Sequence, residues 1–277
     1  MRKSWTSVLL MALFAATVCL LAAGCGGGGT TGSTGGAGGG KKLSVGSDVP
    51  YPPFEEFGKT KTEFKGFDVE LVEAIGKKIG REVEFQDTPF PTIFRDLAQG
   101  KFEMVASATT ITPEREETVD FTNPYYLPSA QSILVKKGTK GLKTEKDLVG
   151  KTVGVQQGTT GEEYVEEEIE TKELRTYPQG PDTIQPLKAG ILDAVVIDRP
   201  VAEKAVEQDP ELEISGGIET EEEYGFVVQQ GNDELREELN EGLEEVIQNG
   251  EYTTIYKKWF GKAPSPEIFR AARHEPT

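Results

Sequence analysis

Hydrophobic and polar residues alternate along the first half of the chain in a way that predicts strands and helices in turn. Short apolar runs predict strands at 43–46, 83–85 and 104–106. Apolar residues at helical spacing predict helices over 67–79 and 92–99. This β-α-β-α-β order predicts a mainly parallel sheet with helices packed on its faces.

The second half of the chain repeats the same order. Strands are predicted at 153–155, 174–177 and 194–197, with helices over 161–168 and 182–189 between them. The sequence therefore predicts an α/β protein with two lobes. In open α/β sheets ligands bind beyond the carboxyl ends of the strands, so the cleft between the two lobes is the expected site.

Four further segments are predicted to connect the lobes and complete the first one. Extended stretches at 131–135 and 224–228 lie between the two α/β units and after the second one. We expect them to act as hinge strands near Ser132 and Phe226. Helices predicted over 233–248 and 252–260 would then return to the first lobe.

The N-terminus carries the pattern of an export signal. Residues 1–24 combine a positive start with an uncharged, mostly apolar run, and small residues lead to Cys25. The ending LAAGC resembles a bacterial lipobox, in which the cysteine is lipidated, although Leu21 lies one place early; an ordinary signal peptide with an incidental cysteine is the alternative. Residues 25–40 are almost entirely Gly, Thr and Ser, which predicts a flexible tether.

Composition excludes several classes of protein. Among 277 residues, 30 Lys and Arg against 47 Asp and Glu give a net charge of −17, which argues against nucleic acid as a partner. The one histidine, His274, permits neither a core nucleophile triad nor a multi-histidine metal site. Cys19 and Cys25 both lie in the leader, so the mature body has no thiol. We therefore expect no metal, no cofactor and no catalytic residues.

Five motifs in the body, the second of them in three parts, resemble the family-3 bacterial extracellular solute-binding proteins, the polar amino-acid-binding proteins of ABC importers. The resemblance runs from about Leu43 to Lys262. It implies the two-lobed periplasmic-binding-protein fold, with lobe 1 at 41–131 and 227–265 and lobe 2 at 132–226. The motifs are 66–71 (GFDVEL), 109–115 (TTITPER), 119–121 (VDF), 124–126 (PYY), 154–161 (GVQQGTTG), 193–198 (DAVVID) and 256–261 (YKKWFG).

The resemblance implies which residues bind the carboxylate of an amino acid. Arg115 would grip both carboxylate oxygens, because its planar guanidinium donates as a fork. Thr110 would add a hydroxyl and a backbone N–H, and the segment from Gly158 to Thr160 would add backbone N–H groups and the Thr160 hydroxyl. The alternatives are a surface ion pair of Arg115 with Glu116 or Glu117, and a simple turn with an N-cap at the glycine segment.

The ammonium group of the ligand would meet two groups. The backbone carbonyl of Ala108 stands where the family receives the ammonium. Asp198 follows four apolar residues and should emerge at the end of a buried strand, where a carboxylate suits a cation. Alternatively, Asp198 caps the next turn before Pro200, with Arg199 as its partner.

Four residues are implied to contact the ligand's side chain. Tyr51 and Phe90 would sandwich it, although ordinary core packing is the alternative for both rings. Asp48 could pair with a basic group or accept from an amide, and Gln156 could bond the distal group. This set favours arginine, lysine or histidine, with glutamine next, and disfavours glutamate.

The expected function is therefore extracellular capture of a free amino acid by lobe closure, for delivery to an ABC importer. The protein is expected to be a monomer, fixed by lipid at the outer face of the cell membrane or in the periplasm. An enzyme on the same scaffold, resembling cyclohexadienyl or arogenate dehydratases, is the alternative. The presence of both Arg115 and Asp198 favours binding of an amino acid.

Overall fold

The computed structural model describes residues 41–273 apart from positions 129 and 221. These residues belong to one compact unit, Gly40–Thr277. The predicted signal peptide and tether, including Cys25, lie outside the described residues. Within the described residues, none of the helices combines the length and the apolar character needed to cross a membrane.

The first sheet is built from β1 (Lys42–Ser47), β4 (Glu82–Asp87), β5 (Met104–Val105), β6 (Val119–Phe121) and β12 (Val227–Gln229). Its strands lie in the order β4-β1-β5-β12-β6. β1 is parallel to β4 and β5, whereas β12 is antiparallel to both β5 and β6. Among these five strands β12 alone runs against the others, so the sheet is mainly parallel, as predicted.

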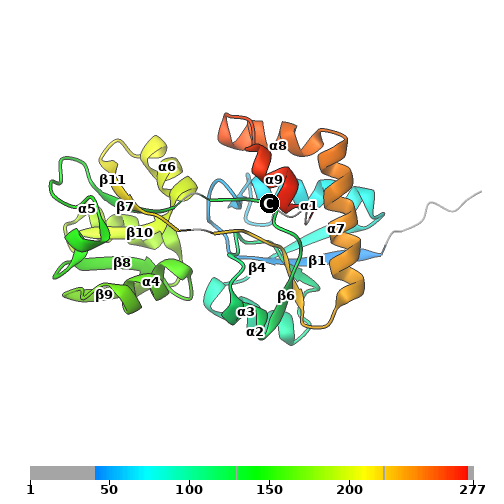
Figure 1. The fold of residues 1–277 in the computed structure, drawn as a ribbon, viewed down its shortest axis with the longest axis horizontal. Coiled ribbons are helices and arrows are strands. Elements are labelled where there is room, and N and C mark those ends of the chain that lie inside the picture. Colours follow the sequence, from blue (N-terminus) through cyan, green and yellow to red (C-terminus); the bar gives the residue numbers. More distant parts are fainter. Residues whose placement is uncertain (1–40, 129, 221, 274–277) are drawn as a thin grey trace, which may run out of the picture. The chain divides into compact units, whose positions relative to one another are not determined.

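Helices cover both faces of the first sheet (Figure 1). They are α1 (Phe67–Lys78), α2 (Phe90–Ala98), α3 (Pro113–Glu116), α7 (Asp233–Gln248), α8 (Glu251–Phe260) and α9 (Pro266–Ala271). Side chains alternate between faces along β5. Met104 packs into the apolar cluster of α1, α7 and α8, and Val105 into that of α2. A small hairpin, β2 (Glu56–Phe57) and β3 (Phe64–Lys65), precedes α1.

The second sheet is built from β7 (Gln131–Lys136), β8 (Thr152–Gln156), β9 (Glu173–Tyr177), β10 (Ala194–Asp198) and β11 (Leu212–Ile218). Its order is β11-β7-β10-β8-β9. β10, β8 and β9 are parallel, and β7 is antiparallel to β10 and β11. Its helices are α4 (Thr160–Glu168), α5 (Ile184–Lys188) and α6 (Arg199–Gln208), with 3₁₀ turns η1 (Glu145–Leu148) and η2 (Gly180–Thr183).

The chain crosses between the sheets twice, from β6 to β7 and from β11 to β12 (Figure 1). The two crossings are hydrogen-bonded to each other. The N–H of Tyr125 donates to the carbonyl of Tyr224 at 2.8 Å, and the N–H of Thr122 donates to that of Phe226 at 2.9 Å. The rings of Tyr125 and Phe226 stack at 4.1 Å, so the two crossings form one connection.

The predicted elements are present, and the differences have physical reasons. The predicted helix over 182–189 is split into η2 and α5, because Pro186 has no N–H to donate to the preceding turn. The predicted hinge stretch 131–135 is β7 itself, a full member of the second sheet. Helices α6 and α9 were not predicted; both are short, and the apolar residues of α6 are mostly small.

Candidate ligand-binding site

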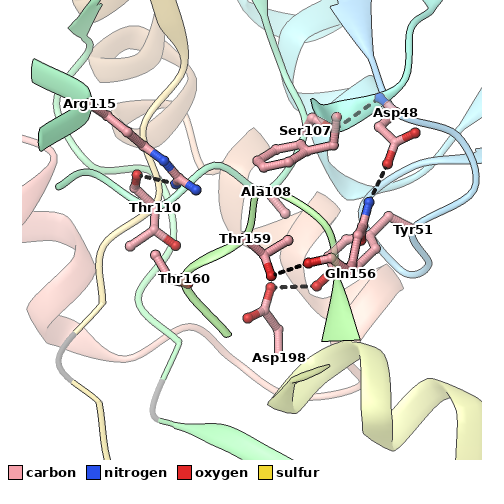
Figure 2. Close-up of a pocket in the computed structure, with 11 residues that line it drawn as sticks. Asp48, Tyr51, Ser107, Ala108, Thr110, Arg115, Gln156, Thr159, Thr160 and Asp198 are labelled. Carbon is pink, nitrogen blue, oxygen red and sulfur yellow. Dashed lines mark hydrogen bonds between the residues drawn. The ribbon is translucent and has the colours of Figure 1, made fainter. Parts of the chain in front are cut away.

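A pocket with an empty volume of about 300 Å³ lies between the carboxyl ends of the two sheets (Figure 2). Residues of the first lobe come from the segments after β1 and β5, from α2 and from α3. Those of the second lobe come from the ends of β8 and β10 and the beginning of α4. The lining residues are Asp48, Tyr51, Phe90, Ser107, Ala108, Thr110, Arg115, Gln156, Thr159, Thr160 and Asp198.

The structure brings all the predicted ligand-binding residues to this pocket except Gly158, which lies next to it. The backbone of Gly158 has φ of +79°, and its carbonyl accepts a hydrogen bond from Arg115. Ser107 lines the pocket but was not predicted, and Thr159 was predicted only as part of the segment from Gly158 to Thr160. Ser107 follows β5 and Thr159 precedes α4, so the carboxyl end of a strand and the N-cap of a helix were the available signals.

Arg115 is held over the pocket by backbone and aromatic contacts. The backbone N–H of Arg115 donates to the side-chain hydroxyl of Thr112, the N-cap residue of α3, at 3.2 Å. Nη1 donates to the carbonyl of Thr110 at 2.7 Å, and Nη2 donates to that of Gly158 at 3.2 Å. The guanidinium carbon lies 5.6 Å from the ring centre of Phe90. In the described part of the chain, no carboxylate forms an ion pair with Arg115, and the alternative pairing with Glu116 or Glu117 does not occur.

Asp198 ends β10 as predicted and is 8% exposed. Its carboxylate accepts from the hydroxyl of Tyr51 at 2.7 Å and from the amide of Gln131. Asp198 stands at the N-cap position of α6 but its side chain makes no capping bond there. Arg199 pairs with Glu203 at 2.9 Å instead. The structure thus disfavours the alternative in which Asp198 caps α6.

Asp48 lies at the opposite side of the pocket from Arg115 (Figure 2). It is 1% exposed, and Nε2 of Gln156 donates to its Oδ2 at 2.6 Å. Burial raises the pKa of Asp48 to about 6, although the hydrogen bonds from Gln156 and Gln179 oppose this shift. The Asp48 carboxyl is therefore largely ionised at neutral pH and titrates near pH 6.

The other predicted residues are positioned by short-range structure. Phe90 begins α2 and packs with Ile93 and Leu97, so the core-packing alternative holds for part of its ring. Ala108 has φ of +42°, and its N–H donates to Asp68 at 2.9 Å. The Thr159 side chain accepts from the N–H of Glu162 at 3.2 Å, so the predicted N-cap before α4 is present.

Two buried acids, not included among the predicted site residues, lie behind the pocket. Glu55 and Asp68 are both fully buried. Glu55 accepts from the hydroxyl of Ser107 at 2.8 Å, and Asp68 accepts from the Ala108 N–H at 2.9 Å and the Tyr125 hydroxyl at 2.6 Å. The remaining oxygens, Oε2 of Glu55 and Oδ1 of Asp68, have no partner among the described residues. The two acids thus support the segment that presents Ala108 to the pocket.

Burial favours the protonated form of Glu55. Burial, with the charge of Asp68, raises the pKa of Glu55 well above its ordinary value. Burial also raises the pKa of Asp68, to about 7, but the bonds from Ala108 and Tyr125 favour its charged form. An unfolded Glu55 releases its proton near pH 4.5, so the contribution of Glu55 to the free energy of unfolding is greatest below that pH. This contribution falls by about 1.4 kcal/mol per pH unit as the pH rises from 4.5 towards the pKa of Glu55 in the folded protein.

The substitution Glu55→Gln is therefore expected to stabilise the protein at pH 7.5 by about 1–3 kcal/mol. An amide can accept from the Ser107 hydroxyl through its oxygen, as the acid does, without the cost of keeping a proton. Urea unfolding at pH 5 and pH 7.5 measures the effect, which should vanish at the lower pH. Asp68→Asn should lower the free energy of unfolding at both pH values, because it weakens the acceptor of the bonds from Ala108 and Tyr125. A Glu55→Gln variant less stable than the wild type at pH 7.5 would contradict this assignment.

Two α/β lobes that enclose a polar pocket define a binding protein for a small solute. The chain belongs to the bacterial extracellular solute-binding proteins, family 3, which it matches over residues 43–262. It is 33% identical to the L-cystine-binding protein TcyJ of Escherichia coli K12 over 79% of this chain and 82% of that protein. It is 36% identical to the arginine-binding extracellular protein ArtP of Bacillus subtilis 168 over 79% of this chain and 86% of that protein.

Solved structures of related proteins have the same fold. An ancestral arginine-binding protein bound to arginine matches with a TM-score of 0.75 and 40% identity, over 79% of this chain and 98% of that one. The arginine-, lysine-, histidine-binding protein ArtJ of Geobacillus stearothermophilus matches with a TM-score of 0.77 and 36% identity, over 83% of this chain and 100% of that one. The ancestral amino acid-binding protein AncCDT-1, a precursor of cyclohexadienyl dehydratase, matches with a TM-score of 0.74 and 36% identity, over 79% of this chain and 95% of that one. The predicted fold class and family are confirmed.

Proposed function

We propose that the protein binds a free amino acid outside the cell, either one with a basic side chain (arginine, lysine or histidine) or glutamine, and delivers it to an ABC importer. One observation carries this proposal. The pocket contains one guanidinium, Arg115, and two carboxylates, Asp198 and Asp48, and none of the three has an ion-pair partner among the described residues. Buried charges need partners, and a zwitterion with a distal cation supplies all three.

The order of these groups matches the order of charges in a basic amino acid. Arg115, with Thr110 close to it, lies on one side of the pocket, and Asp48 lies on the other (Figure 2). Asp198 lies between them in this view. A ligand carboxylate at Arg115 would place its ammonium towards Asp198 and its side chain towards Asp48.

The ionisation of Asp48 selects the class of side chain. Although its pKa is raised, it stays at about 6, so an apolar or acidic side chain would leave a buried charge uncompensated at pH 7.5. A guanidinium or ammonium would compensate it, and an amide would do so partly. The names of arginine-binding relatives support this preference, and the cystine-binding relative supports the broader class of amino acids.

Closure of the lobes would be stabilised by residues that also line the pocket. The Tyr51 hydroxyl bonds Asp198, and Gln156 bonds Asp48, each pair joining the two lobes. Ligand contacts from both lobes would add to these bonds. Ligand binding shifts the population towards the closed form only as far as the ligand prefers that form.

The protein is proposed to act without catalysis, with a dehydratase on the same scaffold as the alternative. A dehydratase that acts on prephenate, which has no ammonium group, has less use for a carboxylate at the position of Asp198, and this pocket keeps both Arg115 and Asp198. Incubation with prephenate and arogenate, followed by detection of the aromatic product, distinguishes the two functions. Product formation that is lost in the Asp48→Asn variant would establish the enzyme.

Attachment to the membrane is proposed to occur through lipid on Cys25. A Cys25→Ser chain expressed in a bacterium should then move from the membrane fraction to the soluble exported fraction. Unchanged fractionation would contradict lipid attachment at this residue.

The side-chain preference is tested by exchanging Asp48 for asparagine. The variant is expected to lose affinity for L-arginine by about 10-fold or more, because a charged hydrogen bond becomes a neutral one. Its affinity for L-glutamine should change by less, so the preference for arginine falls. Calorimetric titration with all twenty amino acids, after unfolding and refolding to remove any bound ligand, measures both. Equal losses for the two ligands would contradict the role of Asp48.

A further inference from the structure

A segment of the second lobe that sequence reasoning did not single out closes the Asp48 end of the pocket. Gln179 lies two residues beyond the end of β9, which is an edge strand, and immediately precedes η2. Its side chain is half-buried. Nε2 donates to the carbonyl of Val49 at 2.8 Å and reaches Oδ1 of Asp48 at 3.5 Å. These contacts join residues 130 and 131 positions apart and connect the two lobes.

The neighbouring glycine brings this segment close to the first lobe. A Cβ atom on Gly180 would lie 3.0 Å from the ring of Tyr51 and 3.1 Å from Oε1 of Gln156. Both distances are tighter than most Cβ contacts, so a side chain here would require Tyr51, Gln156 or the segment itself to shift by a few tenths of an ångström. Glycine at this position therefore allows Gln179 to reach Val49 and Asp48.

The two oxygens of Asp48 face two amides of the second lobe. Oδ2 accepts from Gln156, which lines the pocket, and Oδ1 faces Gln179, which does not. An amide nitrogen carries two hydrogens, so Gln179 can serve Val49 and Asp48 together. A cationic ligand group that displaces Gln156 from Oδ2 would leave Gln179 in place on Oδ1.

We propose that Gln179 is a positioning residue for ligand binding: it joins the lobes at the distal end of the pocket and holds Asp48 towards the cationic end of the ligand. This inference rests on the proposed function for its ligand, but the contact between the lobes does not depend on which ligand binds. Gln179 acts from outside the pocket, through Asp48 and through closure.

Gln179→Glu tests this role because it replaces a donor with a carboxylate of the same size. At pH 8 the new carboxylate would face the Val49 carbonyl and the charged Asp48. Asp87, whose Oδ1 accepts from the N–H of Val49 at 3.3 Å, and Asp182 on η2 add to the negative charge nearby. Closure should then be disfavoured at pH 8 and partly restored at pH 5, where carboxyl groups take up protons.

The expected result is a dissociation constant for L-arginine at least about 10-fold above that of the wild type at pH 8, with the ratio of the two constants falling towards one when both proteins are measured at pH 5. Gln179→Met, which removes the donor without adding charge, should weaken binding by about 2- to 10-fold at both pH values. Gln185→Glu, at an exposed glutamine of α5, is the matched control and should bind as the wild type does.

Small-angle X-ray scattering without added ligand supplies a second measurement that does not depend on ligand identity. Gln179→Glu should have a larger radius of gyration than the wild type at pH 8 and a similar one at pH 5. If the wild type binds no amino acid but this variant still expands, the proposed function fails and the role of Gln179 in closure stands. If the wild type binds L-arginine and Gln179→Glu matches it in affinity and scattering at pH 8, the inference is wrong.

Discussion

Replacing Arg115 with alanine is expected to weaken amino-acid binding by roughly 30- to 5000-fold, equivalent to about 2–5 kcal/mol. The guanidinium is half-buried, and its described bonds are to the carbonyls of Thr110 and Gly158. Its charge is thus available to a ligand carboxylate, which would otherwise be desolvated without a cationic partner. Titration calorimetry with L-arginine measures the loss.

Two controls separate this effect from unfolding and from general electrostatics. Arg95→Ala removes an arginine whose side chain on α2 is 64% exposed, and should leave affinity unchanged. Arg115→Lys keeps the charge but loses the fork, so its affinity should lie between those of the wild type and the alanine variant. A folded Arg115→Ala protein that binds L-arginine as the wild type does would contradict the carboxylate assignment.

Asp198→Asn is expected to weaken binding by about 2 kcal/mol or more, which is at least roughly 30-fold. The amide oxygen can still accept from the Tyr51 hydroxyl, but the amide nitrogen cannot accept from Gln131, so the variant loses that bond as well as the charge that faces the ammonium. Asp182→Asn, at an exposed carboxylate of η2, is the control and should have no effect on affinity.

The two substitutions should also respond differently to a ligand without a carboxylate. Agmatine has the guanidinium and amine of arginine but no carboxylate. The effect of Arg115→Ala should largely disappear with agmatine, whereas that of Asp198→Asn should remain. The same loss for both ligands in both variants would indicate a general disturbance of the pocket.

The sequence predicts this pocket well because its residues follow elements with a clear pattern. Asp48 and Asp198 follow or end buried strands, and the carboxyl ends of such strands meet at one edge of a sheet. Arg115 follows a threonine and a proline that begin a helix. The family resemblance then assigned roles that no spacing alone could supply, and those roles remain predictions.

Other features depend on contacts that no local pattern records. Gln179 lies in an irregular segment between two prolines, and its partners are 130 and 131 residues away. Glu55 is an acidic residue, for which exposure is the usual outcome, yet it is fully buried, as Asp68 is. The reversed direction of β12 follows from strand register, which a single sequence does not reveal.

The most direct test of the central claim is a titration of the ligand-stripped protein with L-arginine beside agmatine and N-acetyl-arginine. The pocket is proposed to need a carboxylate at Arg115, an ammonium at Asp198 and a cation at Asp48. Binding of L-arginine at micromolar or tighter affinity, with each analogue weaker by about 30-fold or more, is the predicted result. No binding of L-arginine or of any other amino acid would contradict the account.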